Sequence, residues 1–213
     1  QASQLATSTR IVSNSFSSKT GALNGGSAFN LSFNQGPSPG VDTSVSVTSP
    51  TPSGVVSAIN DANIGVSAVL INKSAAVTES ALATFSSMTA GQSFTLAGVT
   101  VQASGSVSAA DVASAFASLS SGGAPNAVSN LAFSGNFSGW TTGAADGSKV
   151  RFTSTTAGGG VSDLAATDSN GVSSLVGVAT TQGVADNWYI SLSGDTGLQN
   201  QFSLSSSPDL GFS

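Results

Sequence analysis

The residues that could do chemistry are few and widely spaced. The chain of 213 residues contains no histidine and no cysteine, so it lacks the commonest general base, the thiolate nucleophile and the usual soft-metal ligands. A serine nucleophile would then need a lysine as its base. Only Ser17-Ser18-Lys19 and Lys73-Ser74 place the two residue types side by side. We interpret both as solvated loop residues, and we predict that the protein is not an enzyme.

The carboxylates do not form an obvious catalytic pair. A glycosidase needs two of them about 5–10 Å apart across a cleft. Most of the 10 acidic residues here lie beside Gly, Asn or Ser, in contexts typical of turns and helix caps. They are Asp42, Asp61, Glu79, Asp111, Asp146, Asp163, Asp168, Asp186, Asp195 and Asp209.

Two local patterns were considered as ligand sites, one for calcium and one for phosphate, and neither fits. Asp163, Asp168 and Asn170 lie close in sequence, and Asp195 lies in a Gly-Asp-Thr-Gly stretch. Calcium needs about six to eight oxygen ligands, usually from several carboxylates in a defined loop, and no such loop occurs. The glycines at 158–160 precede an expected strand rather than a helix, without a phosphate-binding lysine. We therefore predict no cofactor and no metal site.

Aromatic side chains are the remaining candidates for binding. Trp140, Trp188 and Tyr189 are possible partner contacts, because aromatic residues often anchor proteins or sugars. Packing in a core or at a sheet edge is the alternative for each. Trp140 is flanked by Gly139 and Thr141, so we expect it to be the more exposed tryptophan.

Charge excludes two classes of partner. Charged residues make up 7% of the chain, the net charge is −5, and there are 5 basic residues. So few cations cannot follow a phosphate backbone or hold an anionic membrane surface. No apolar run is long enough to span a membrane, so we predict neither nucleic-acid binding nor membrane insertion.

The elements that must position these side chains are mostly strands. Alternating apolar residues predict strands over 28–33, 41–48, 66–71, 84–89, 92–103, 131–137, 149–155, 161–167, 188–192 and 201–204, with turns at Gly91, Gly98 and 194–197. Ser53 and Ser108 are expected helix N-caps, with stops at 63–65 and 122–123. The expected fold is β-dominated α+β, built from small antiparallel sheets that each carry one short helix.

The segment TPSGVVSAINDANIGVSAVLIN (51–72) resembles the IN motif of flagellar axial proteins, in which a short helix ending in Ala-Ile-Asn precedes a strand. LATSTRIVSNSFSSKTGALNGGSAFNLSF (5–33) resembles the stretch where the flagellar filament cap protein, hook-associated protein 2, passes from its helical legs into its head. NWYISLSGDTGLQNQFSLSSSPDLGF (187–212) is similar to the strand, turn and strand that follow the IN motif in that family.

The spacing of these pieces predicts two domains. In the cap family the strand after the IN motif is followed closely by one like 188–192, whereas residues 73–187 intervene here. We expect a base domain of residues 1–73 plus 186–213, with residues 74–185 inserted as a second domain. The insert is loosely similar to repeats of large bacterial surface proteins.

The resemblance implies an extracellular structural protein of the bacterial flagellum. A cap protein oligomerises at the filament tip and assists the assembly of flagellin, so the expected partners are further copies of the full-length protein, flagellin and other axial proteins. Two alternatives stay open. One is the variable outer domain of a flagellin or of hook-associated protein 1, and the other is a surface adhesin that binds host mucin or glycans. Strand edges with so few lysines also favour association between chains.

Overall fold

The chain folds into two compact units, each with its own core. The computed structural model describes residues 8–37, 39–168, 175–197 and 201–213. Unit 1 comprises Gln1–Ala75 and Asp186–Ser213, and unit 2 comprises Ala76–Ala185. The division falls within two residues of the boundaries that the sequence predicts. Strands outweigh helices throughout, so the expected β-dominated α+β class is confirmed.

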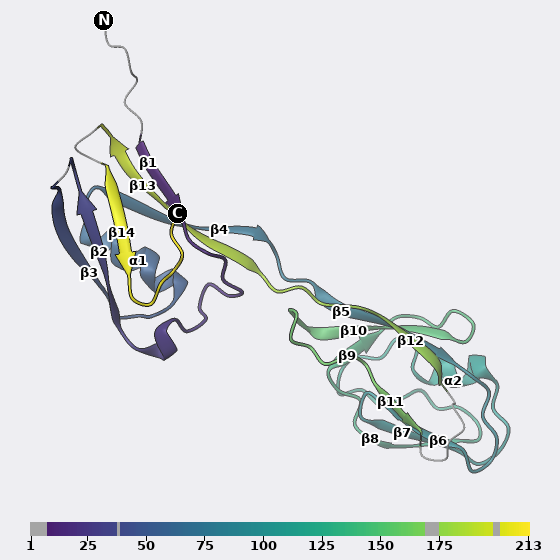
Figure 1. The fold of residues 1–213 in the computed structure, drawn as a ribbon. Coiled ribbons are helices and arrows are strands. Elements are labelled where there is room, and N and C mark those ends of the chain that lie inside the picture. The colour runs from purple at the N-terminus through teal and green to yellow at the C-terminus, as the bar shows by residue number, and fades with distance from the viewer. Residues whose placement is uncertain (1–7, 38, 169–174, 198–200) are drawn as a thin grey trace, which may run out of the picture. The chain divides into compact units, whose positions relative to one another are not determined.

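Unit 1 contains two antiparallel sheets and one α-helix (Figure 1). The first sheet has the order β1-β13-β4, and the second has the order β14-β2-β3. The elements are β1 (Ser8–Val12), the 3-10 turn η1 (Asn24–Gly26), β2 (Phe29–Gln35), β3 (Val41–Val47), α1 (Pro52–Ala62), β4 (Val66–Ser74), β13 (Asn187–Thr196) and β14 (Phe202–Ser206). Inward-facing residues of both sheets meet the apolar face of α1 in one core, which includes Leu31, Phe33, Val47, Val55, Ile59 and Leu192.

Local sequence explains where α1 begins and ends. Thr51 is the N-cap: its hydroxyl accepts a hydrogen bond from the Gly54 N–H at 3.0 Å, and Pro52 follows at the first helical position. Asn63 ends the helix in the left-handed region with φ of 49°. Gly65, with φ of 74°, completes the reversal into β4.

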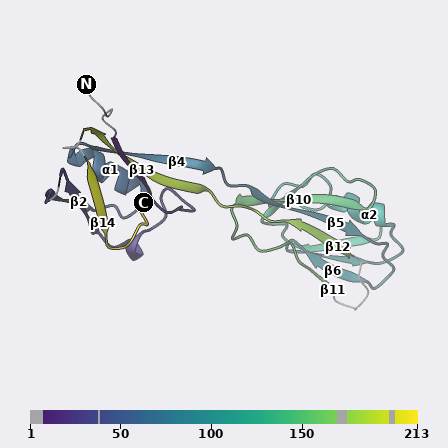
Figure 2. The same ribbon diagram turned by 45° about the horizontal axis from the view of Figure 1, so that its top comes forward.

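Unit 2 contains two four-stranded antiparallel sheets and a short helix. One sheet has the order β12-β5-β10-β9, and the other has the order β11-β6-β7-β8. Figure 2 shows β10, β5 and β12 running side by side. The elements are β5 (Thr78–Phe85), β6 (Ser93–Leu96), β7 (Val99–Ala103), α2 (Ala109–Ala115), β8 (Leu131–Gly135), β9 (Trp140–Thr142), β10 (Lys149–Ala157), β11 (Ala166–Asp168) and β12 (Leu175–Thr181).

Phenylalanine rings fill the core of unit 2. Phe116 follows α2 and is fully buried. Its ring lies 5.4 Å from that of Phe85 and 6.0 Å from those of Phe94 and Phe152, measured between centroids. Small residues dominate the rest of the chain, so these large rings supply much of the apolar area that unit 2 buries.

Several expected boundaries are wrong. Thr51, not Ser53, caps α1. The second helix keeps its expected cap at Ser108 but ends at Ala115, where the Asn126 side chain donates to the carbonyls of Ser114, in the last turn, and Ala117, beyond it. A strand expected at 161–167 exists only as β11, and the turn expected at 194–197 lies mostly within β13.

Three strands, β1, β9 and β12, lie outside the expected strand ranges, and β5 begins six residues before the predicted strand at 84–89. The inward-facing residues of β5 include an acid and two alanines, Glu79, Ala81 and Ala83. They are therefore hardly more hydrophobic than the outward-facing residues, and the alternation of the strand is weak in the sequence. Among the described residues, no helix has the length and apolar character needed to cross a membrane.

We expect Phe116→Ala to lower the free energy of unfolding of unit 2 by about 3–5 kcal/mol, because it leaves a cavity among three other rings. Denaturant unfolding followed by Trp140 fluorescence, in a Trp188→Phe background, measures this. Val41→Ala is the control, since Val41 is 68% exposed, and should change stability by less than about 0.5 kcal/mol. Equal effects of the two substitutions would contradict this assignment of the core.

Candidate protein-binding surface

The segment that resembles the IN motif folds around one asparagine. Asn60, near the end of α1, donates from its side-chain amide to the Ala68 carbonyl at 3.0 Å and accepts from the Ala68 N–H at 2.8 Å. Both bonds reach the same residue of β4, so the amide holds the helix end against the strand in one register. The neighbouring Ile59 is fully buried in the core. The Ile-Asn pair therefore has a structural role, one residue packing α1 and the other bonding it to β4.

A second side-chain bond holds the reversal between α1 and β4. Gln35, the last residue of β2, donates from its side-chain amide to the Ile64 carbonyl at 2.6 Å. Ile64 is partly buried against the core. The loop is thus tied to the second sheet of the unit, and β4 starts from a fixed point.

Because β4 is held in this way, its two faces have different environments. Val66 and Ala68 point into the core. Val69 and Ile71 point outward and are 54% and 42% exposed. Their partners across the ladder are Ser191 and Tyr189 of β13, and Val12 of β1 lies opposite Ser191.

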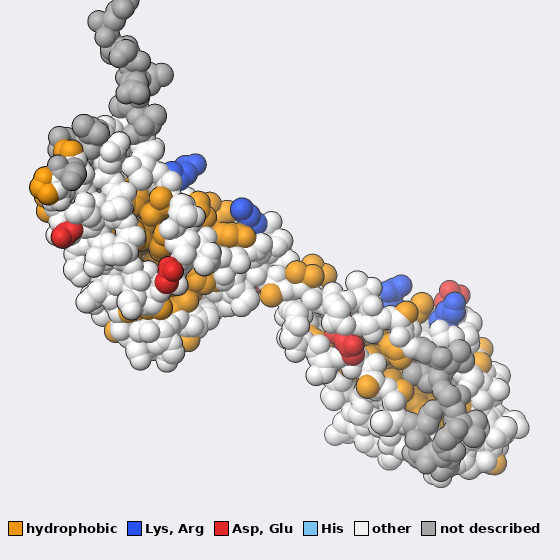
Figure 3. Space-filling model, in the orientation of Figure 1, with side chains coloured by type: hydrophobic (Ala, Val, Ile, Leu, Met, Phe, Trp, Pro, Cys, Tyr) orange, Lys and Arg blue, Asp and Glu red, His pale blue; other side chains and the backbone are white. Residues whose placement is uncertain are grey.

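These residues form a continuous outer face on the β1-β13-β4 sheet. Arg10 extends it at one end, opposite Ser193, and Lys73 extends it at the other, two residues beyond Ile71. Figure 3 shows hydrophobic side chains gathered beside basic ones on unit 1, on a surface that carries few other charges. We call this surface the outer apolar face and define it by Arg10, Val12, Val69, Ile71, Lys73 and Tyr189.

Both lysines of unit 1 lie over aromatic rings. The Lys73 amino nitrogen is 4.4 Å from the centre of the Tyr189 ring, and the Lys19 amino nitrogen is 5.8 Å from that of Trp188. Cation–π contacts of this kind are worth about 0.5–1 kcal/mol at exposed sites. These are also the two lysines of the Ser–Lys pairs considered above, and each is directed at an aromatic ring.

The three predicted contact residues do not lie together. Trp140 is in unit 2, whereas Trp188 and Tyr189 are in unit 1. The expectation that Trp140 is exposed is wrong: it is only 7% exposed, because β9 directs it onto the core of unit 2. Trp188 and Tyr189 are both half-buried but alternate along β13, so only Tyr189 lies on the outer apolar face.

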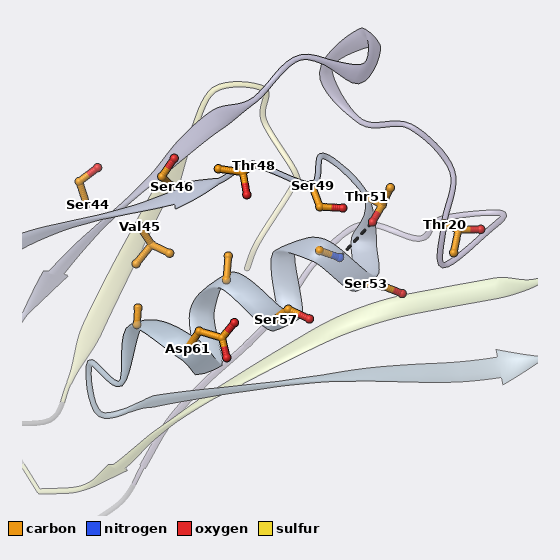
Figure 4. A pocket seen from close by; sticks show the side chains of 13 residues that line it. Thr20, Ser44, Val45, Ser46, Thr48, Ser49, Thr51, Ser53, Ser57 and Asp61 are labelled. Atoms are coloured by element: carbon orange, nitrogen blue, oxygen red, sulfur yellow. Dashed lines mark hydrogen bonds between the residues drawn. The ribbon is translucent and has the colours of Figure 1, made fainter.

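A polar groove lies on another side of unit 1, between α1 and β3 (Figure 4). It has a volume of about 740 Å³, and hydroxyl side chains from both elements point into it. Asp61 is the one charged residue in its lining, and the lining residues are Thr20, Ser44, Val45, Ser46, Thr48, Ser49, Thr51, Ser53, Gly54, Ser57, Ala58, Asp61 and Ala62. A lone carboxylate among hydroxyls provides hydrogen-bonding groups but no activated nucleophile.

The residues considered as calcium ligands do not form a site: one is hydrogen-bonded to another side chain and another lies in a strand. Asp163 accepts a hydrogen bond from the Gln182 side chain at 2.6 Å, and Asp195 lies in β13. Asn170 falls outside the described residues. Within the part of the chain that the structure describes, no group of three or more acidic residues gathers as metal ligands would.

Comparison of the chain with protein-family models, with curated proteins and with solved structures found no match.

Sequence reasoning missed most of the outer apolar face, although a signal was present. In a strand with one buried face, apolar residues alternate. The run Val69-Leu70-Ile71 breaks this alternation, since Leu70 packs against the core while its two neighbours point outward. An apolar run within a strand that borders a small core was therefore the available sign of an exposed apolar surface.

We expect Asn60→Ala to destabilise unit 1 by about 1–3 kcal/mol, because it removes two bonds to Ala68 and leaves those backbone groups without their partner. Denaturant unfolding followed by Trp188 fluorescence in a Trp140→Phe background measures the change. Ser57→Ala is the matched control, since Ser57 lies one turn earlier on α1 and is exposed. A loss no larger than that of the control would show that Asn60 does not secure β4.

Proposed function

We propose that this chain is the structural head region of a flagellar filament cap protein, acting through contacts with neighbouring protein subunits at the filament tip. One observation carries the proposal. The segment resembling the IN motif folds as a helix and strand joined by Asn60, and the same strand presents Val69 and Ile71 outward. The strand of a motif typical of axial proteins thus carries exposed apolar side chains on its outer face.

The composition of the outer apolar face favours a protein partner. Tyrosine and arginine are enriched among residues that dominate binding energies, and apolar side chains supply the area that association buries. Val69 and Ile71 are exposed β-branched residues next to Tyr189. Because the face has only two cations, we propose that its contacts are governed mainly by apolar burial and depend weakly on salt.

The absence of histidine and cysteine from the sequence supports a non-catalytic role. Asp61 is the one charged residue of the groove in Figure 4, so this groove lacks the second carboxylate that paired-carboxylate chemistry needs. We propose that the polar groove contributes surface shape rather than a reaction site.

Antibodies raised against this chain should label the tips of flagella in immunogold electron microscopy, because a cap protein resides there. Cells that carry a deletion of the gene are the control for specificity. Label along the whole filament would instead favour the outer domain of a flagellin. Label spread over the cell surface, with none on flagella, would favour the adhesin alternative and overturn the proposal.

The surface itself is tested by Val69→Asp combined with Ile71→Asp. We expect this double variant of the full-length protein to weaken self-association at least about tenfold, because each carboxylate must be desolvated at the contact. Sedimentation velocity across a wide concentration range measures the effect. Val41→Asp, on β3 of the same unit, is the control for an added charge at an exposed valine. Equal association by both variants would place the contact elsewhere.

A further inference from the structure

The groove between α1 and β3 runs along an open edge of a sheet. β3 is the last strand in the order β14-β2-β3, so only one of its two edges is paired. Three consecutive residues of β3, Ser44, Val45 and Ser46, line the groove. Val45 faces the core whereas both serines face solvent, and a cavity that touches both faces of a strand must lie along its edge. Figure 4 shows β3 on one side of the groove and α1 on the other.

The hydrogen bonds of β2 decide which backbone groups of β3 remain open. The Gly36 N–H, just after β2, donates to the Gln201 carbonyl, just before β14, at 2.8 Å. Successive residues in an antiparallel strand direct their backbone groups alternately to its two sides. Neither ladder of this sheet shifts register, so the even-numbered residues of β2 bond to β14 and the odd-numbered ones bond to β3.

Ser44 and Ser46 are therefore left with open backbone groups. The odd-numbered residues of β2 pair with odd-numbered residues of β3, as Leu31 does with Val45. The N–H and C=O groups of the two serines point the other way, toward the open edge. Among the described residues, neither serine makes a backbone hydrogen bond outside the ladder. One more strand placed in the groove would satisfy these groups, which is the geometry of peptide recognition by β-strand addition.

The opposite wall of the groove is one face of α1, and its residues are small. Gly54, Ser57 and Ala58 line it together with Asp61. Short side chains leave room for an extended backbone and for the side chains that it directs at the helix. Asp61 is exposed, and no described lysine or arginine lines the groove. The groove thus offers a strand edge, a shallow wall and one negative charge.

Charge indicates what kind of chain fits. A second copy that paired through its own β3 would bring no cation to Asp61, because β3 contains none. It would add another acid instead, since Asp42 lies on β3. A different polypeptide with a lysine or arginine in its extended segment complements the groove better.

We propose that this groove binds an extended segment of a partner protein, which pairs antiparallel with β3 and directs a lysine or arginine at Asp61. About five residues of the segment face the stretch from Ser44 to Thr48, at one residue per residue of β3. One face of the added strand contacts Val45 and Ala58. The other face lies beside the two serines as cross-strand neighbours. The proposal goes beyond the function proposed above, since the outer apolar face is on the other sheet of unit 1.

The first test uses the full chain and the peptide acetyl-Thr-Val-Thr-Lys-Thr-Val-Thr-amide, followed by amide NMR spectra. We expect saturable shifts at the Ser44 and Ser46 amides and slower hydrogen exchange there, because both N–H groups gain an acceptor. The control peptide carries norleucine in place of lysine. It should bind about two- to fivefold more weakly, as expected for the loss of one exposed ion pair.

N-methylated peptides test strand addition itself. In the antiparallel arrangement the two threonines beside the lysine face Ser44 and Ser46 and bond to them. Methylation of the backbone nitrogens of these threonines should abolish binding, because it removes the donors that β3 needs. Methylation at the two valines is the matched control, since their N–H groups point away from β3, and it should leave binding in place.

Two substitutions test the groove from the side of the protein. Asp61→Asn should lower the affinity of the lysine peptide to that of the norleucine peptide, whereas Asp146→Asn, in unit 2, should have no effect. Ser44→Pro should weaken binding at least about tenfold, because proline removes an N–H that the ladder with β2 does not use. Ser44→Ala is its control and should bind normally. The methylated peptides serve if Ser44→Pro does not fold.

Four results would overturn the proposal. They are absence of saturable binding, equal affinity for the lysine and norleucine peptides, equal affinity for the two methylated peptides, and full affinity in folded Ser44→Pro. Shifts at Ser44 and Ser46 that grow with protein concentration, without peptide, would assign the edge to a second copy and would also contradict it. Labelling of flagellar tips and the Val69→Asp, Ile71→Asp variant report on the function proposed above, so failure of one proposal is distinguishable from failure of the other.

Discussion

The antiparallel pairing of β4 with β13 is the constraint on which the rest of the chain depends. It joins residues 66–74 to residues 187–194, so unit 1 is complete only when both parts of the chain are present. The inserted unit must then begin and end at neighbouring points. It does so through the bridge between Val77 and Val184 and through the pairing of β5 with β12. A discontinuous domain of this kind relies on contacts between residues far apart in sequence, which cost loop-closure entropy.

With so few charges, specificity of packing rests on neutral groups. In unit 1 the Asn60 amide sets the position of β4, and in unit 2 stacked phenylalanines fill the space between α2 and its sheet. Neutral hydrogen bonds and apolar area are both insensitive to ionic strength. Glu79 stands out against this background, because burial of a carboxyl group without a hydrogen-bond partner opposes folding.

The segments with strong alternation or clear caps were the predictable ones. β2 and β3 match their expected ranges closely, because large apolar residues alternate with polar ones. The cap of α2 also lies at the expected Ser108, whose hydroxyl accepts a hydrogen bond from the Asp111 backbone N–H. β9 and β12 were missed, since β9 has only three residues and β12 carries glycine and threonine within a weak pattern. Of the contact candidates, Tyr189 lies on the outer apolar face, whereas Trp140 proved to be buried.

The sequence by itself determined the fold class, the two helices, the division of the chain and the lack of histidine or cysteine chemistry. The fold class, the helices and the missing chemistry follow from composition and from patterns within a few neighbouring residues, whereas the division of the chain was predicted from the spacing of the segments that resemble the cap family. Only the tertiary structure decided which side chains face solvent. The outer apolar face combines β1, β4 and β13, so it arises from strand register. A shift of one residue reverses the face on which a side chain lies, and no local pattern here specifies that register for strands rich in small residues.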